Sequence, residues 1–162
     1  MNINLIKIIT LGGRIMKNIG LLLSSIAGFF IILGCLFYNS LLIDMNEIKD
    51  YVTESNVILQ DVMENEDKVN DKKGDYISRL MKIKKGMENS QTSFLFDKYK
   101  IIKISSIELL IDAISEDNED DKDEYLKLIF ESNNESQDEL DTLMNKNFIE
   151  VTYLCLKTYI KI

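Results

Sequence analysis

The sequence contains no histidine, no proline and no tryptophan, and it has only two cysteines among 162 residues. Histidine is the commonest general base and the commonest metal ligand, so its absence excludes histidine-dependent catalysis and the usual zinc sites. The chain also lacks a glycine-rich phosphate loop, a G-x-S-x-G motif and a cysteine pair with metal spacing. We therefore expect a protein that is not an enzyme and that needs no cofactor and no metal.

Negative charge is absent from the first 43 residues of the chain. All 27 acidic residues lie at or after Asp44, and Lys7, Arg14 and Lys17 are the only charged residues before it. Of the 19 basic residues, 16 remain from Asp44 onward, which leaves this part strongly acidic. Such a surface repels phosphate backbones, so we do not expect nucleic acid as a partner.

One long apolar run lies near the N-terminus. Residues 19–38 read IGLLLSSIAGFFIILGCLFY, which is 20 residues without a charge. At about 1.5 Å per residue this run can span a hydrocarbon core of roughly 30 Å. Lys and Arg are enriched on the cytoplasmic side of membranes, so the basic flank predicts a cytoplasmic N-terminus and an outer C-terminal part. The alternative is the buried core helix of a soluble protein.

These features predict three regions in the chain. A short basic cytoplasmic leader covers residues 1–18, a single transmembrane helix or signal-anchor covers residues 19–43, and an acidic helical domain outside the cytoplasm covers residues 44–162. Met16 is an alternative start, because an AGGAGG-type ribosome-binding sequence can encode the preceding Leu-Gly-Gly-Arg-Ile. The abundance of Ile, Lys and Asn suggests AT-rich codons and a bacterial cell membrane as the location.

The end of the apolar run resembles a lipoprotein signal. Ile32-Leu33-Gly34-Cys35 is similar to the lipobox of bacterial lipoproteins, a resemblance that implies lipidation of Cys35 and removal of the residues before it. The chain stays apolar after Cys35, however, which favours a retained membrane helix. Both interpretations stay open at this point.

Small residues recur at every fourth position of the apolar run. Gly20, Ser24 and Gly28 have the small-xxx-small spacing that lets two membrane helices approach closely. This face could support a homodimer, although glycine and serine are also ordinary components of membrane helices and signal segments.

The region after the apolar run has the apolar periodicity of helices. A spacing of three and four predicts a first helix that reaches residue 73, formed around Leu41, Met45, Ile48, Val52, Leu59, Val62 and Val69. Ser55 and Glu66 interrupt this row of apolar positions, so we expect the helix to pack on other helices of the chain rather than to form a regular coiled coil. Residues 70–74 have turn chemistry, and Tyr76, Leu80, Ile83 and Met87 share one face of the next helix.

Further helices are predicted toward the C-terminus. Residues 94–114 are apolar on several faces and should form the central helix of a bundle, after a loop at residues 89–93. Residues 120–133 predict another helix with Leu126, Ile129 and Phe130 inward, and Ser136-Gln137-Asp138-Glu139 looks like a capping box that starts the next one. The alternative is that the two are one helix bent near Asn133 and Asn134. With a helical tail from Val151, the fold class is all-α, with an outer bundle of four to five helices.

Charge is concentrated in two stretches of the outer part. A basic stretch between Lys72 and Lys85 is expected to pair with acids elsewhere, for which the run from Glu116 to Glu124 is the complement. In the acidic run, Asp117, Glu119 and Asp121 have calcium-loop spacing, but the Gly and the bidentate Glu of an EF-hand are missing. We predict a solvated loop here.

The layout predicts a membrane-anchored protein with a non-enzymatic outer bundle for protein interaction or sensing. It is similar to the helical sensor bundles of bacterial chemoreceptors, which also begin with a basic leader and a membrane helix, and the resemblance is one of layout. The membrane and another protein are the expected partners. Two alternatives are an envelope-associated lipoprotein lipidated at Cys35 and an envelope hydrolase. The many carboxylates would supply accidental pairs for the latter without indicating a site.

Overall fold

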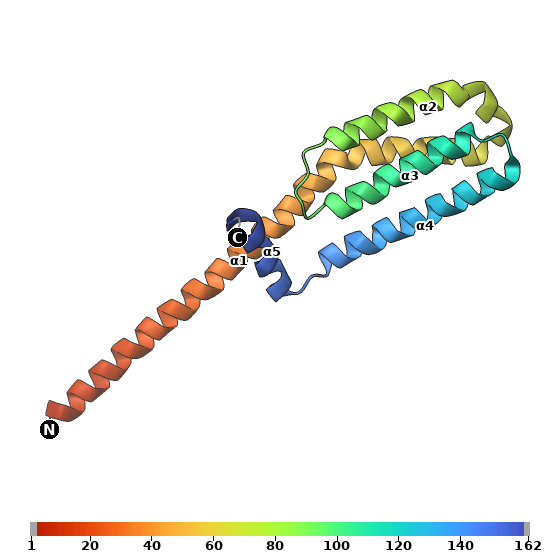
Figure 1. Ribbon diagram of the computed structural model, residues 1–162. Coiled ribbons are helices and arrows are strands. Elements are labelled where there is room, and N and C mark those ends of the chain that lie inside the picture. Colours follow the sequence, from red (N-terminus) through yellow and green to blue (C-terminus); the bar gives the residue numbers. More distant parts are fainter. Residues whose placement is uncertain (1–2, 161–162) are drawn as a thin grey trace. The chain divides into compact units, whose positions relative to one another are not determined.

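The computed structural model describes residues 3–160, and within them it leaves the side chains at positions 3–19, 21, 66–68, 148, 155, 156 and 158–160 undescribed. The described chain is helical, without a strand (Figure 1). The five helices are α1 (Ile3–Glu64), α2 (Glu66–Asn89), α3 (Asp97–Ser115), α4 (Glu119–Met144) and α5 (Phe148–Ile160). The predicted all-α class and the helix at the C-terminus are confirmed.

The chain forms two compact units. One contains Met1–Phe37 together with Phe148–Ile162, and the other contains Tyr38–Asn147. The division between the units falls inside α1, which is helical throughout Ile3–Glu64. The second unit is a bundle formed by the C-terminal part of α1 with α2, α3 and α4.

Ion pairs between successive helices define the order of this bundle. Glu54 of α1 accepts hydrogen bonds from Arg79 of α2 at 3.2 Å, Lys84 of α2 lies 2.5 Å from Glu108 of α3, and Lys98 of α3 lies 2.6 Å from Glu139 of α4. Residue numbers rise along one helix as they fall along its neighbour: Asp61 and Glu54 of α1 pair with Lys72 and Arg79 of α2, and Lys73 and Lys84 of α2 pair with Asp117 and Glu108. Lys98 and Lys103 of α3 likewise contact Glu139 and Asn133 of α4, so the four helices alternate in direction (Figure 1).

Apolar side chains from all four helices form the core of the bundle. The predicted face of α2, consisting of Tyr76, Leu80, Ile83 and Met87, is buried, and so are Leu41, Ile48 and Val62 of α1. Full burial of one such aliphatic side chain contributes about 1.5–3 kcal/mol, so this core holds the helices together. Ile107 of α3 is buried as expected for a central helix, whereas Phe130 of α4 is exposed and its inward assignment was wrong.

The turn between α1 and α2 lies earlier than the sequence indicates. Asn65 is the only residue between the two helices, and residues 70–74 are helical. Asn65 donates a backbone hydrogen bond to the Asp61 carbonyl at 3.0 Å and a side-chain hydrogen bond to the Asp61 carboxylate at 2.7 Å. This pair closes the last turn of α1. Gly74, the basis for the expected turn, lies inside α2 with open space around its Cα.

The helix α4 is a single helix, as in the alternative interpretation, and its first turn replaces part of the predicted acidic loop. Ser136 lies in its interior and donates to the Asn133 carbonyl at 2.7 Å instead of capping a new helix. At the start of α4, the Asn118 side chain accepts a hydrogen bond from the Asp120 N–H at 3.1 Å and acts as the N-cap. Acids in a first helical turn interact favourably with the helix dipole, which explains why the acidic run from Glu119 onward is helical.

Candidate functional site

The predicted residues of the apolar run lie on an uncovered helix. Gly20 and Ser24 are exposed and Gly28 is half-buried, and a Cβ added at either glycine would meet no atom within 4 Å. Cys35 is an exposed free thiol, whereas Leu33 and Phe37 beside it are buried. Packing of the small residues and lipidation of Cys35 stay predictions. The apolar neighbours Tyr153, Leu154 and Leu156 in the sequence predict a buried thiol at Cys155, whose side chain lies outside the described residues.

Most of the described apolar side chains in this part of α1 are exposed. Within the described part of the chain, the segment Leu22–Glu64 includes the one stretch apolar and long enough to cross a membrane, and 17% of that stretch is buried. Its exposed side chains include Leu22, Leu23, Ile26, Phe29, Ile31 and Ile32.

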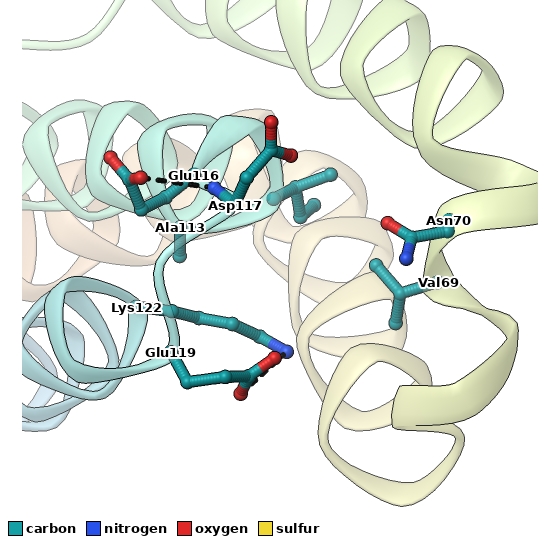
Figure 2. Close-up of a pocket in the computed structure, with 8 residues that line it drawn as sticks. Val69, Asn70, Ala113, Glu116, Asp117, Glu119 and Lys122 are labelled. Atoms are coloured by element: carbon teal, nitrogen blue, oxygen red, sulfur yellow. Dashed lines mark hydrogen bonds and ion pairs between the residues drawn. The ribbon is translucent and has the colours of Figure 1, made fainter.

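A polar cavity of about 490 Å³ lies at the end of the bundle where α2 begins and α3 ends. Figure 2 shows the residues that line it, which come from α2, from the end of α3 and from the start of α4. The ammonium of Lys122 is near the Glu119 carboxylate, at 4.0 Å, and the lysine is only 7% exposed. A buried lysine places a positive charge beside the most acidic segment of the protein.

The carboxylates around this cavity have separate partners. Glu116 accepts a hydrogen bond from the backbone N–H of Asp117 at 3.0 Å (Figure 2) and another from the backbone N–H of Asn118 at 3.0 Å. Asp117 pairs with Lys73 at 2.9 Å, and this lysine lowers the pKa of its carboxyl group. Among the described residues, no three acidic or cysteine side chains converge as metal ligands. The chemistry of the cavity is therefore that of ion pairing.

The burial of Lys122 was missed from the sequence. The four buried residues of α4 are Lys122, Ile129, Ser136 and Leu143, which recur at every seventh position. A strict seven-residue repeat marks the side of a helix that faces its neighbours. Because two of the four residues are polar, a search for apolar periodicity alone does not detect this repeat.

A second cluster of charges lies at the turn between α1 and α2. The Tyr76 hydroxyl donates to the Asp61 carboxylate, and Lys72 pairs with the same carboxylate at 3.2 Å. The Tyr76 hydrogen bond, followed by that of Lys72, lowers the pKa of Asp61, while burial raises the pKa of Tyr76. This arrangement stabilises the ionised form of Asp61. It joins two helices.

An open groove of about 450 Å³ lies between α3 and α4. Ile101 and Leu128 are exposed apolar residues that line it, and Glu131 and Glu135 of α4 line it as well. Its remaining lining residues are Ile102, Ser105, Leu109 and Ser132. An apolar surface next to carboxylates is suited to an apolar segment that carries Lys or Arg.

The predicted pairing of the basic stretch is confirmed for one residue of the acidic run. Lys73 pairs with Asp117, as expected, but Arg79 pairs with Glu54 and Lys84 pairs with Glu108.

A scan against protein-family models and searches of curated proteins and of solved structures find no match to this chain.

Proposed function

We propose that this protein is a single-pass membrane protein whose four-helix bundle lies outside the cytoplasm and binds another protein. The observation that carries the proposal is the uncovered apolar surface of α1, where Leu22, Ile26, Phe29 and Ile31 are exposed. A core helix of a soluble protein would have these side chains covered by its own fold. Burial of apolar area contributes about 25 cal/mol per Å², so a bilayer is the environment that stabilises this surface.

The distribution of charged residues along the sequence supports a cytoplasmic N-terminus and a bundle outside the cytoplasm. The basic residues Lys7, Arg14 and Lys17 precede the apolar run, and the acids begin at Asp44. Positive residues remain preferentially on the cytoplasmic side, so the bundle is the translocated part. The absence of histidine from the whole sequence supports a binding role for the bundle rather than a catalytic one.

The lipoprotein alternative predicts that the N-terminal part of α1 is removed. Lipidation of Cys35 would remove residues 1–34 and with them most of the uncovered apolar surface. Retention is supported by helix α1, which has buried residues on both sides of Cys35, at Leu33 and Phe37. Intact-mass measurement separates the two: a diacylglyceryl group on a chain that begins at Cys35 would contradict retention.

The topology can be tested by cysteine labelling in cells that lack an outer membrane. Cys35→Ser and Cys155→Ser remove the native thiols, and Lys82→Cys then places a single thiol at an exposed position of α2. It should react with a membrane-impermeant maleimide in intact cells. Lys17→Cys is the matched control on the other side of the apolar run and should react only after lysis. The reverse pattern would contradict the orientation.

The groove between α3 and α4 is the binding surface that we propose for the partner. A photo-crosslinking amino acid at Ile101 should give a discrete crosslinked product in intact membranes, and Leu128→Asp should remove it. The same amino acid at Met81, an exposed apolar residue of α2, is the control. Equal products from both positions would show that apolar exposure alone causes the crosslinks. A product with twice the mass of the chain would identify a homodimer.

A further inference from the structure

The C-terminal helix α5 has two apolar sides. Its charged residues with described side chains, Glu150 and Lys157, are seven positions apart and therefore lie on one narrow stripe of the helix. Val151 lies about 100° from Glu150 in one direction, and Ile149 lies about 100° in the other. Apolar residues therefore flank the polar stripe on both sides. Tyr153 extends the side of Ile149, and the sequence continues its spacing at Leu156 and Ile160.

Only one of these sides is covered. Val151 is 5% exposed, and a helix of 13 residues cannot bury its own side chain. The compact unit that contains α5 also contains the part of α1 that ends at Phe37, where Leu33 and Phe37 are buried. Because α5 and this part of α1 belong to one compact unit, we infer that the side of α5 that contains Val151 packs against α1.

The other side of α5 is open. Ile149 is 78% exposed and Tyr153 is 65% exposed. On α1, Ile32 and Leu36 are also exposed, within the same compact unit. Leu33 and Phe37 lie near the end of the uncharged run 19–38, the level at which a membrane helix of this length reaches the outer headgroups.

We propose that α5 lies in the outer interface of the bilayer as an amphipathic helix, so that the membrane binds the C-terminal helix as well as α1. This inference rests on the anchoring proposed above. Ile149 and Tyr153 contact the acyl chains and the interfacial layer, where tyrosine is enriched. The stripe of Glu150 and Lys157 faces the headgroups, and the lysine is attracted to anionic lipid.

A bilayer fits this surface better than a second copy of the chain. The exposed side of a helix of 13 residues is about 20 Å long and 10 Å wide, or about 200 Å², far below the roughly 800 Å² per partner of a stable interface. The same compact unit also contains the exposed apolar side chains of α1, which we propose to face lipid.

Depth-dependent fluorescence quenching tests the proposal on the full chain. In the background of Cys35→Ser and Cys155→Ser, Tyr153→Cys carries an environment-sensitive fluorophore. The protein is reconstituted in phosphatidylcholine and phosphatidylglycerol vesicles that contain nitroxide lipids in both leaflets. A headgroup nitroxide should quench this label more than a deep nitroxide, and Ile149→Asp should abolish the quenching. Asp123→Cys, at an exposed position near the start of α4, is the control that should stay unquenched.

A label at Phe29→Cys separates failure of the membrane anchor from failure of the interfacial helix. Quenching of Phe29 by the deep nitroxide together with an unquenched Tyr153 would overturn the interfacial helix and leave the anchor intact. An unquenched Phe29 would overturn the anchor and with it the interfacial helix. Disulfide formation between copies at Tyr153→Cys, without lipid quenching, would show that a second copy covers this side and would also overturn the proposal.

Discussion

The buried carboxylate of Asp44 accepts two hydrogen bonds from Ser93, which follows it by 49 residues. The Ser93 N–H donates to Oδ1 at 3.0 Å and the Ser93 hydroxyl donates to Oδ2 at 2.5 Å. Asp44 is only 3% exposed, so these bonds replace its contacts with water. The contact fastens the loop between α2 and α3 to α1.

Replacing Asp44 should therefore destabilise the bundle. Asp44→Ala leaves the Ser93 N–H without this acceptor, at a cost of about 1–3 kcal/mol for an unsatisfied buried donor. Ser93→Ala retains the backbone N–H bond and should cost less. Urea unfolding of the full chain in detergent measures both variants. An equal loss for the two would mean that the hydroxyl bond accounts for the whole effect.

Two glycines of α2 should respond in opposite ways to alanine. At Gly74 a Cβ meets nothing within 4 Å, so Gly74→Ala should raise the free energy of unfolding by about 0.5–1 kcal/mol through reduced backbone entropy. At Gly86 a Cβ would lie 2.5 Å from Cε1 of Tyr51 on α1. Overpacking of this kind costs about 1–3 kcal/mol, so Gly86→Ala should lower stability. Equal stabilisation by the two changes would show that the Tyr51 ring moves aside freely.

The contribution of α3 to the core can be tested at Ile107. This residue is buried, and Ile107→Asp would place an unpaired carboxylate in the core at a cost of several kcal/mol, a large part of the roughly 5–15 kcal/mol stability of a domain. We expect loss of the cooperative thermal transition. Ile101→Asp makes the same chemical change at an exposed position of α3 and should leave the transition in place. Retained cooperativity in Ile107→Asp would mean that the core does not depend on this helix.

The inward faces of the bundle could be predicted where apolar residues alone define them. Tyr76, Leu80, Ile83 and Met87 follow helical spacing without a polar interruption, so their burial follows directly from periodicity. The helix around Ile107 was found as an apolar segment, but it is not surrounded on all sides: Ser105, Glu108, Asp112 and Ser115 form an exposed polar stripe on it. The long apolar helix at the N-terminus was likewise visible in the sequence.

The turn and the polar core positions could not be predicted in this way. The turn at Asn65 depends on the side chain of Asp61 and on two residues of the following helix, Lys72 and Tyr76, that reach back to it. Local turn propensity instead favoured Gly74. The buried Lys122 follows the seven-residue repeat of α4 but carries a charge, so composition placed it on the surface. Tertiary contacts decided both cases.

Acid should weaken the turn between α1 and α2. Hydrogen bonds from Tyr76 and Lys72 lower the pKa of Asp61 below its ordinary value of 3.8. A carboxyl group with a lowered pKa in the folded state contributes stability that is fully present above the ordinary value and is lost as the pH falls through the folded value. Asp61→Asn should therefore destabilise the protein at neutral pH, and its difference from the wild type should shrink as the pH falls below 3.8.

Urea unfolding as a function of pH checks this expectation. Asp123→Asn, at an exposed position of α4, makes the same change in charge and should follow the wild-type curve. A difference between Asp61→Asn and the wild type that stays constant down to strong acid would contradict an ionic contribution from Asp61. It would show instead that the Asp61 side chain stabilises the turn through packing and not through its charge.

The acidic run should stabilise the start of α4. The first turn of this helix contains Glu119, Asp120 and Asp121, and Asp117 pairs with Lys73. A solvated loop would gain stability from Asp117→Asn, Asp120→Asn and Asp121→Asn together, because like charges would be removed. In the observed helix these changes remove an ion pair and two favourable interactions with the helix dipole. The triple variant should therefore melt slightly lower at low salt, with the difference reduced at high salt.

Calcium gives a second measurement on the same residues. A cation bound only by the folded state raises the melting temperature by mass action. The carboxylate of Asp117 pairs with Lys73, and that of Glu116 accepts two backbone N–H groups, so neither points with the others toward a common centre. Calcium and magnesium at equal ionic strength should therefore shift the melting temperature equally, in the wild type and in the triple variant. A calcium-selective rise of several degrees that the triple variant loses would show that the run holds the ion, because general screening acts equally on both cations.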